Sequence, residues 1–184
     1  MKRVFFVCFI FSWLTTTAQN DTTYYSDLLK TADEIQLSDS LNINAELNQI
    51  NLLDSITVKK WFSPILGSVN NNRLKNRNYY LAGKITSNDN FDLLFLKEEK
   101  KKSDSTSVEV FYLITTKKDG TYIASIQAAV AGIRKKSNYN TSSWLYKDYK
   151  LVLDAKYTIN QKLYTDLTNY KINGGGRFIL YPKD

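Results

Sequence analysis

The chain contains no histidine and a single cysteine, Cys8. Without an imidazole it cannot build a Ser-His-Asp triad, a Cys-His pair or a histidine-ligated zinc site. The Ser-x-x-Lys motif of Ser-Lys enzymes is also missing. Apart from the Cys8 thiol, the side-chain chemistry that remains consists of carboxylates, amines, hydroxyls and aromatic rings. We therefore expect neither a metal ion nor a cofactor.

The length of 184 residues suits one domain with its own hydrophobic core. Hydrophobic residues make up 43% and charged residues 23% of the chain, which is typical of a globular protein rather than a disordered one. Aromatic residues reach 14%, with 13 tyrosines. Because tyrosine is favoured in strands, this enrichment already suggests a fold rich in β-structure.

The N-terminus has the pattern of a signal peptide. A basic Met-Lys-Arg start is followed by an apolar run over residues 4–14, and small residues lead up to Ala18. A run of this length is too short for a membrane-spanning helix, which needs roughly 20 residues. We predict a signal peptide over residues 1–18, with cleavage between Ala18 and Gln19. An uncleaved membrane anchor is the alternative reading.

Cleavage would remove the only cysteine and two basic residues, leaving 23 basic and 18 acidic residues and a net charge of +5. Cys8 lies inside the apolar run and not in a lipobox, so we do not expect a lipoprotein. The prediction is an exported protein, periplasmic or secreted, without a transmembrane span in the mature chain. An exported protein rarely meets nucleic acid, so we expect no nucleic-acid partner.

Residues 19–184 are predicted to form a single α+β domain with two parts. Residues 19–72 should be mainly helix and loop, and residues 73–184 should be a β-meander. The first helix is expected from Thr22 to Leu37, where apolar residues recur at helical spacing. The second follows an N-cap at Asp54-Ser55 and is expected to be closed by Pro64 and Gly67.

Apolar and polar residues alternate from residue 78 onward, which is typical of strands. Short links without helices between the strands predict an antiparallel meander, as a curved sheet or partial barrel packed against the N-terminal helices. The Asp119-Gly120 pair is the strongest hairpin signal among these links. About seven strands are expected, over residues 78–86, 91–97, 108–116, 121–131, 145–159, 162–172 and 177–181.

The leader ending in Thr-Ala-Gln, the Trp61-Phe62 pair and the strand sequences over residues 78–85, 91–94 and 112–120 resemble those of small exported proteins of Bacteroidota bacteria. This resemblance implies an envelope or secreted location in a Gram-negative cell and no particular activity. It also implies that Asp-Ser/Thr tripeptides could be O-glycosylated, although Asp54-Ser55 is more simply a helix cap. The tripeptides are at residues 21–23, 39–41, 54–56 and 104–106.

Paired carboxylates are the main enzymatic chemistry left, because a glycosidase needs only two of them at a suitable separation. Most of the candidates alternate with apolar residues, so a solvated strand face explains them without catalysis. A small carboxylate-dependent glycan hydrolase is therefore an alternative function. The candidates are Asp92, Glu98, Glu99, Glu109, Asp148, Asp154 and Asp166.

Basic clusters are expected in loops, where lysine keeps a sheet protein soluble. They are Lys97 with residues 100–102, Lys117-Lys118, and residues 134–136. The last cluster has aromatic neighbours and is the candidate binding site, a basic and aromatic surface for an acidic partner. Its residues are Arg134, Lys135, Lys136, Tyr139 and Trp144.

The leading hypothesis is an exported, envelope-associated binding or accessory protein without catalytic activity. Its partner would be an envelope glycan, a lipid headgroup or a protein. The hydrolase is one alternative, and an inhibitor or immunity-type protein is another.

Overall fold

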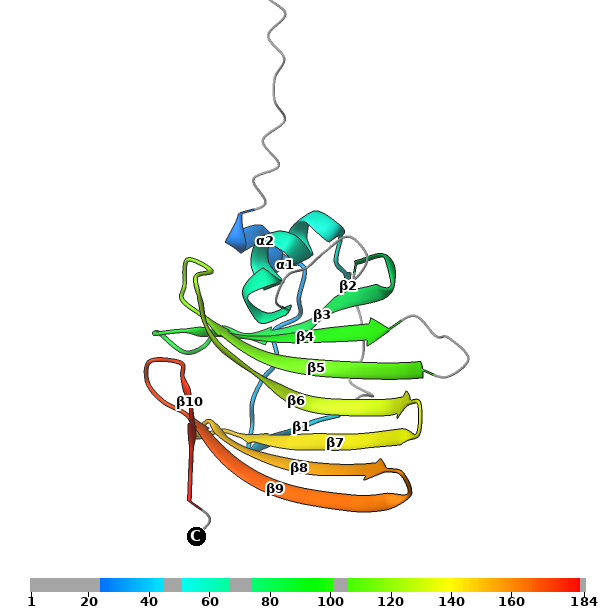
Figure 1. Ribbon diagram of the computed structural model, residues 1–184. Coiled ribbons are helices and arrows are strands. Elements are labelled where there is room, and N and C mark those ends of the chain that lie inside the picture. Colours follow the sequence, from blue (N-terminus) through cyan, green and yellow to red (C-terminus); the bar gives the residue numbers. More distant parts are fainter. Residues whose placement is uncertain (1–23, 45–50, 67–73, 101–105, 183–184) are drawn as a thin grey trace, which may run out of the picture.

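The computed structural model describes residues 24–44, 51–66, 74–100 and 106–182 (Figure 1). The predicted signal peptide and its cleavage site lie outside these residues. The elements in chain order are α1 Tyr25–Lys30, β1 Ser40–Ile43, β2 Asn51–Leu52, α2 Ser55–Leu66, β3 Arg77–Ile85, β4 Asp92–Lys100, β5 Thr106–Thr116, β6 Tyr122–Arg134, β7 Ser137–Tyr146, β8 Lys150–Ile159, β9 Lys162–Ile172 and β10 Phe178–Leu180. No helix among these elements is long and apolar enough to cross a bilayer.

The strands form one open antiparallel sheet in the order β10-β9-β8-β7-β6-β5-β4-β3-β2. The meander predicted from the sequence is therefore confirmed, and the two helices lie beside β3 to β5 at one end of the sheet (Figure 1). Strand β1 is off this path. It pairs with residues 143–146 of β7, beyond the part of β7 that pairs with β6.

The sheet has ten strands where about seven were predicted. Two of the additional strands, β1 and β2, are short and lie in the segment expected to be helix and loop. The third is β7, which ends at Tyr146 because the chain turns before β8 begins at Lys150. This turn contains neither glycine nor proline. It is made by Tyr149, whose φ of 63° is in the left-handed region.

Helix α1 ends at Lys30, well before the expected end at Leu37. The chain after it is extended because Ile35 donates a backbone hydrogen bond to Lys84 of β3, with an N···O distance of 2.7 Å. Gly83 makes this close approach possible, since a Cβ atom there would lie 2.4 Å from the Ile35 side chain. Pairing with β3 therefore replaces helix in this segment.

Helix α2 starts at the predicted N-cap. The Asp54 carboxylate accepts backbone hydrogen bonds from Ile56 and Thr57, at 2.8 and 2.9 Å. Pro64 lies inside α2, which extends to Leu66, so the proline alone does not close the helix; Gly67, the other residue expected to close it, lies outside the described residues. Proline has no N–H for the carbonyl four residues earlier, so the helix tolerates one missing bond near its end.

Strand β4 has hydrophobic core on both faces. Leu94 and Leu96 pack with the helices, whereas Leu93 and Phe95 pack with residues of β1, β7 and β8 on the opposite side. A strand buried on both sides has a continuous apolar sequence rather than an alternating one. Strand β4 and its neighbours thus form the buried centre of the molecule, from which the β6–β7 and β8–β9 hairpins extend (Figure 1).

Candidate functional site

The turns that end the β6–β7 and β8–β9 hairpins lie next to each other. Ser137, just after the first turn, pairs with Ile159, just before the second. We call residues 132–139 and 157–164 the hairpin tip; it lies at the edge of the sheet where the β6–β7 and β8–β9 turns end the two hairpins (Figure 1). A cavity of about 460 Å³ opens there, and it is lined by Arg134, Lys135, Lys136, Ser137, Tyr139 and Asn160.

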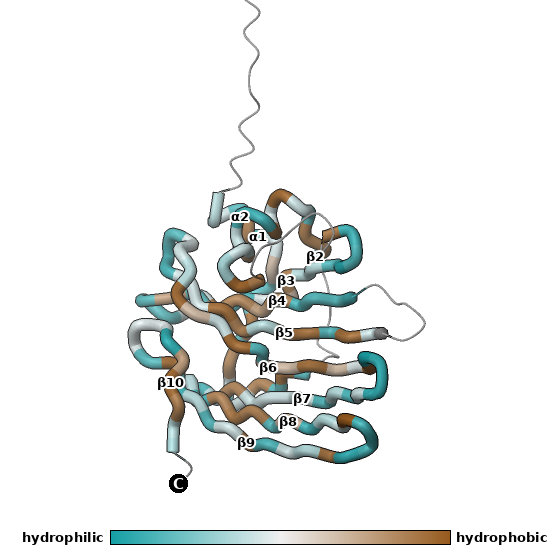
Figure 2. The backbone as a smooth tube through the Cα atoms, viewed as in Figure 1, coloured by the Kyte–Doolittle hydropathy of each residue, from teal (hydrophilic) through white to brown (hydrophobic). Residues whose placement is uncertain are grey.

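The hairpin tip carries cations without matching anions. Arg134, Lys135 and Lys136 are exposed, and so is Lys162 on the neighbouring turn. None of these four forms an ion pair among the residues that the structure describes, and no carboxylate lines the cavity. The β6–β7 turn is accordingly one of the hydrophilic segments in Figure 2. The site is therefore suited to an anionic ligand.

A row of tyrosines crosses the sheet beside these cations. Tyr139, Tyr157 and Tyr164 are cross-strand neighbours on β7, β8 and β9, and Gly132 of β6 completes the row. The rings of Tyr157 and Tyr164 are stacked, with centroids 5.3 Å apart and planes 10° from parallel. The Lys162 ammonium lies 5.3 Å from the Tyr164 centroid. The row presents flat aromatic surface, and Tyr164 is 38% exposed.

The backbone of both turns is unusual for the residues that occupy it. Lys135, Asn160 and Gln161 have φ values of 56°, 49° and 68°. Glycine adopts this left-handed region freely and asparagine tolerates it, whereas other residues pay roughly 1 kcal/mol or more. Lys135 and Gln161 are thus held in conformations that their side chains disfavour. Such positions concentrate at functional sites.

Four of the five residues predicted to form the binding site come together at the hairpin tip. The fifth, Trp144, does not. It lies five residues beyond Tyr139 on the same strand, so strand alternation places its side chain on the other face of the sheet. Its cross-strand neighbours there are Val152 and Asn42. The sequence reasoning missed Tyr157, Tyr164 and Lys162, because only the pairing register places them beside Tyr139.

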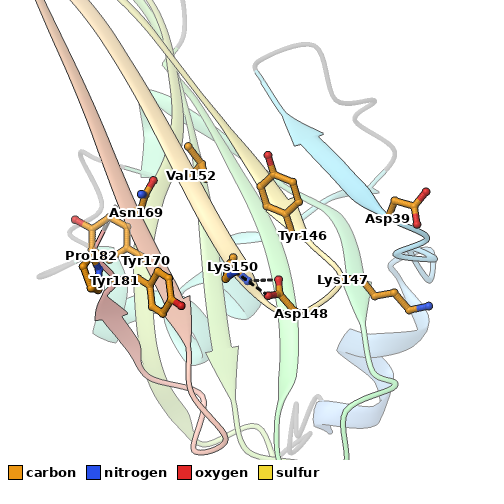
Figure 3. Close-up of a pocket in the computed structure, with 10 residues that line it drawn as sticks. All are labelled: Asp39, Tyr146, Lys147, Asp148, Lys150, Val152, Asn169, Tyr170, Tyr181 and Pro182. Carbon is orange, nitrogen blue, oxygen red and sulfur yellow. Dashed lines mark hydrogen bonds and ion pairs between the residues drawn. The ribbon is translucent and has the colours of Figure 1, made fainter. Parts of the chain in front are cut away.

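A second cavity, of about 510 Å³, lies near the β7–β8 turn and the last described residues (Figure 3). Its charges are of both signs and partly neutralise each other. Asp148 and Lys150 point toward one another, with an N···O distance of 3.5 Å. The Lys150 ammonium also lies 5.3 Å from the ring centroid of Tyr181. This cavity offers less unpaired charge than the hairpin tip.

Asp148 and Asp166 are exposed, as the solvated strand face suggested by the sequence requires, but two other candidate carboxylates are buried. Asp92 is 1% exposed and Glu98 is 3% exposed, on the helix side of β4. Lys97 is also buried in β4 and bonded to Glu109, not placed in a loop. Each candidate has a partner among the described residues: Asp92 with Lys118 and Tyr25, Glu98 with Arg77 and Tyr112, Glu99 with Tyr80, Glu109 with Lys97, Asp148 with Lys150, Asp154 with Lys156, and Asp166 with Thr168.

Glu99 and Glu109 are the two candidates that come nearest to a catalytic pair, because they are directly opposite each other on β4 and β5. Their neighbours bind them: the Lys97 ammonium is 2.7 Å from Glu109, and the Tyr80 hydroxyl is 3.2 Å from Glu99. Burial, and after it the charge of Glu99, raises the pKa of Tyr80. In the described part of the chain, no three Asp, Glu, His or Cys side chains gather as metal ligands would.

No family model matches the chain, and no curated protein or solved structure shows significant similarity to it.

Proposed function

We propose that this chain is an exported, envelope-associated protein that binds an anionic carbohydrate at the hairpin tip and has no catalytic activity of its own. The observation that carries the proposal is the juxtaposition of four cations without described counter-ions and three tyrosines in one row. Export rests on the signal-peptide pattern of residues 1–18.

The two parts of the hairpin tip fit the two parts of an acidic sugar. Carboxylate, sulfate or phosphate substituents accept hydrogen bonds from Arg134 and the lysines. The flat apolar side of a sugar ring packs against aromatic rings such as Tyr157 and Tyr164, which combine contact area with a hydroxyl group. A purely electrostatic partner would need the cations alone. The tyrosine row is the reason for preferring a carbohydrate.

The strained turns support the same assignment. Lys135 and Gln161 occupy backbone positions where glycine would be more stable. For Lys135, a solvated turn position alone would not favour the costlier side chain. A binding role for Lys135, whose side chain lines the cavity, accounts for it.

Binding to a single short glycan is expected to be weak and salt-dependent. An exposed ion pair contributes only about 0.2–1 kcal/mol, and salt screens charges beyond about 10 Å at 0.1 M ionic strength. Several contacts in a row are therefore needed for useful affinity. The natural ligand should be a polymer with repeated charges.

The test is calorimetric titration of the purified protein with polygalacturonate, with neutral dextran as the reference. Ion pairs of Arg134 and Lys136 with the ligand should together contribute about 1.4 kcal/mol to the binding free energy. The double variant Arg134→Gln with Lys136→Gln should therefore bind about tenfold more weakly. Tyr164→Ala should weaken the binding that persists at high salt. The proposal is wrong if dextran binds as well as polygalacturonate.

A matched control removes the same number of charges elsewhere. Lys117→Gln with Lys147→Gln takes two exposed lysines from other loops, and Lys147 lines the second cavity. This control should retain the affinity of the unaltered protein. Equal losses in the two double variants would show general charge attraction instead of a site.

The hydrolase alternative has one observation in its favour, the cross-strand position of Glu99 and Glu109. Side chains directly opposite in an antiparallel pair have Cβ atoms about 5 Å apart, compatible with a retaining glycosidase. Release of reducing ends from the same polysaccharides, abolished by Glu99→Gln and by Glu109→Gln, would replace the binding proposal with this one.

A further inference from the structure

Strand β9 has an open edge. It pairs with β8 along its whole length, but β10 covers only residues 170–172 on its other side. The Tyr181 N–H donates to the Asn169 carbonyl at 2.9 Å and extends this cover by one residue. Residues 162–168 have no further neighbour among the described strands, and β9 is the lowest long strand in Figure 1.

The pairing register shows which backbone groups this edge presents. Ile159 and Lys162 close a two-residue hairpin turn, so the N–H and C=O groups of Lys162 point toward β8. The direction of the backbone N–H and C=O groups alternates along the strand, so those of Leu163, Thr165 and Leu167 point away from β8, toward the open edge. Asn169 follows in the same series and does bond outward, to Tyr181. Three residues thus offer donors and acceptors that no described residue uses.

One face of this edge carries two exposed leucines on either side of Thr165. Leu163 and Leu167 are 64% and 50% exposed. Tyr164 and Asp166 lie on the opposite face. Exposed edge strands are usually protected by proline, by several lysines or by a bulge. In the uncovered part, residues 162–168, only Lys162 is basic, and the strand contains no proline.

We propose that this edge pairs with the same edge of a second copy of the chain, antiparallel and centred on Thr165. A two-fold axis perpendicular to the sheet keeps each side chain on its own face of the sheet. Cross-strand partners share a face, so the sequence numbers of two paired residues must differ by an even number. Centring on Thr165 lets Leu163, Thr165 and Leu167 bond to Leu167, Thr165 and Leu163 of the second copy. All the outward backbone groups are then used.

Side chains complement each other in this register. On one face Leu163 of each copy lies opposite Leu167 of the other, so the exposed leucines of both copies cover each other. On the other face Tyr164 is opposite the second copy's Asp166, so a hydroxyl can donate to a carboxylate. Both pairs form twice because of the symmetry.

The neighbouring registers are worse. Centring on Tyr164 places Leu163 opposite Thr165 and uses only two outward residues of each copy. Centring on Asp166 places two aspartates directly opposite each other, which is destabilising. It also places Leu163 opposite Asn169, whose carbonyl already accepts from Tyr181. The sequence of β9 therefore selects the Thr165-centred pairing.

The pairing rests on the β9 edge, although it shares Leu163 and Tyr164 with the hairpin tip. A dimer would carry two hairpin tips and bind a polymer more tightly than one copy does. The test is sedimentation velocity of the purified protein over a range of concentrations. The unaltered chain should change from monomer to dimer in the micromolar range. Sedimentation as a monomer at every concentration would overturn the proposal.

Two charge variants test the register. Thr165→Lys and Thr165→Glu each place like charges opposite each other on the axis, so each should be monomeric. An equimolar mixture should recover the dimer, because the opposite charges then face each other. Recovery also shows that both variants are folded. A mixture that stays monomeric, or single variants that dimerise like the unaltered chain, would contradict the Thr165-centred pairing.

The control for charge alone uses an exposed strand residue away from this edge. Gln127 of β6 is exposed and lies opposite Tyr112 of β5, away from the β9 edge. Gln127→Lys and Gln127→Glu should dimerise as the unaltered chain does. The polygalacturonate titration is repeated on monomeric Thr165→Lys to test the two proposals separately. This variant should still bind, because each copy has a complete hairpin tip.

Discussion

The hydroxyl of Tyr25 donates a hydrogen bond to the carboxylate of Asp92, 67 residues further along the chain, at 3.1 Å. The other Asp92 oxygen accepts from the Lys118 ammonium at 2.6 Å. The Tyr25 hydroxyl also lies 2.6 Å from the Thr116 hydroxyl. Burial raises the pKa of Tyr25 above its ordinary value. This buried network fastens α1 to the ends of β4 and β5.

Replacing Tyr25 with phenylalanine should lower the free energy of unfolding by about 1–3 kcal/mol, because the Asp92 carboxylate loses a buried donor. Urea unfolding followed by circular dichroism measures the change. The same substitution at Tyr24, which is 67% exposed, serves as the control. Tyr24→Phe should change stability by less than about 0.5 kcal/mol. Equal effects of the two substitutions would mean that the network does not hold the helix.

The Asp54 cap predicts how stability depends on pH. The backbone N–H of Thr57 stabilises the ionised carboxylate and lowers its pKa below 3.8. A group whose pKa is lower in the folded state stabilises the fold above its unfolded pKa. This contribution is lost as the pH falls through the folded pKa. The cap should therefore weaken below about pH 4 and stay constant above about pH 5.

Two variants separate the charge of Asp54 from its hydrogen bonds. Asp54→Ala should cost about 1 kcal/mol at pH 7, because the first turn of α2 loses its acceptor. Asp54→Asn retains an acceptor and should stay close to the unaltered protein at pH 7. The unaltered protein should then lose its remaining advantage over Asp54→Asn between pH 4 and 2. A constant difference across that range would argue against the cap.

Local signals in the sequence were sufficient for the hairpins but not for the surface that the hairpins build. The Asp119-Gly120 pair predicted a turn, and Gly120 has the positive φ that such turns require. By contrast, the turn at Tyr149 has no glycine to announce it. Tyr139 and Tyr157 are 18 positions apart, and only the register of β7 on β8 makes them neighbours.

Strand alternation could have corrected one of the site predictions. Trp144 was grouped with Tyr139 because they are close in sequence, yet an odd separation on one strand places two side chains on opposite faces. The burial of Lys97 and Asp92 could not have been found in this way. It depends on β5 and on the β5–β6 turn, which supply Glu109 and Lys118 as partners.

The two strained turns of the hairpin tip separate a binding role from a structural one. Lys135→Gly and Gln161→Gly both place glycine at a positive φ. Removing the left-handed penalty outweighs the greater freedom of the unfolded chain, so each should raise the free energy of unfolding by about 0.5 kcal/mol. Urea unfolding measures this gain.

Binding should respond differently to the same two substitutions. Lys135→Gly removes one cation from the cavity and should weaken polygalacturonate binding about threefold, as expected for one exposed ion pair. Gln161→Gly removes no charge, so it should weaken polygalacturonate binding less than Lys135→Gly does. A variant that is more stable but binds less well indicates that the side chain is retained for the ligand. If both variants gained stability without loss of binding, Lys135 would be an ordinary turn residue, and its strained backbone would no longer support a binding site at this cavity.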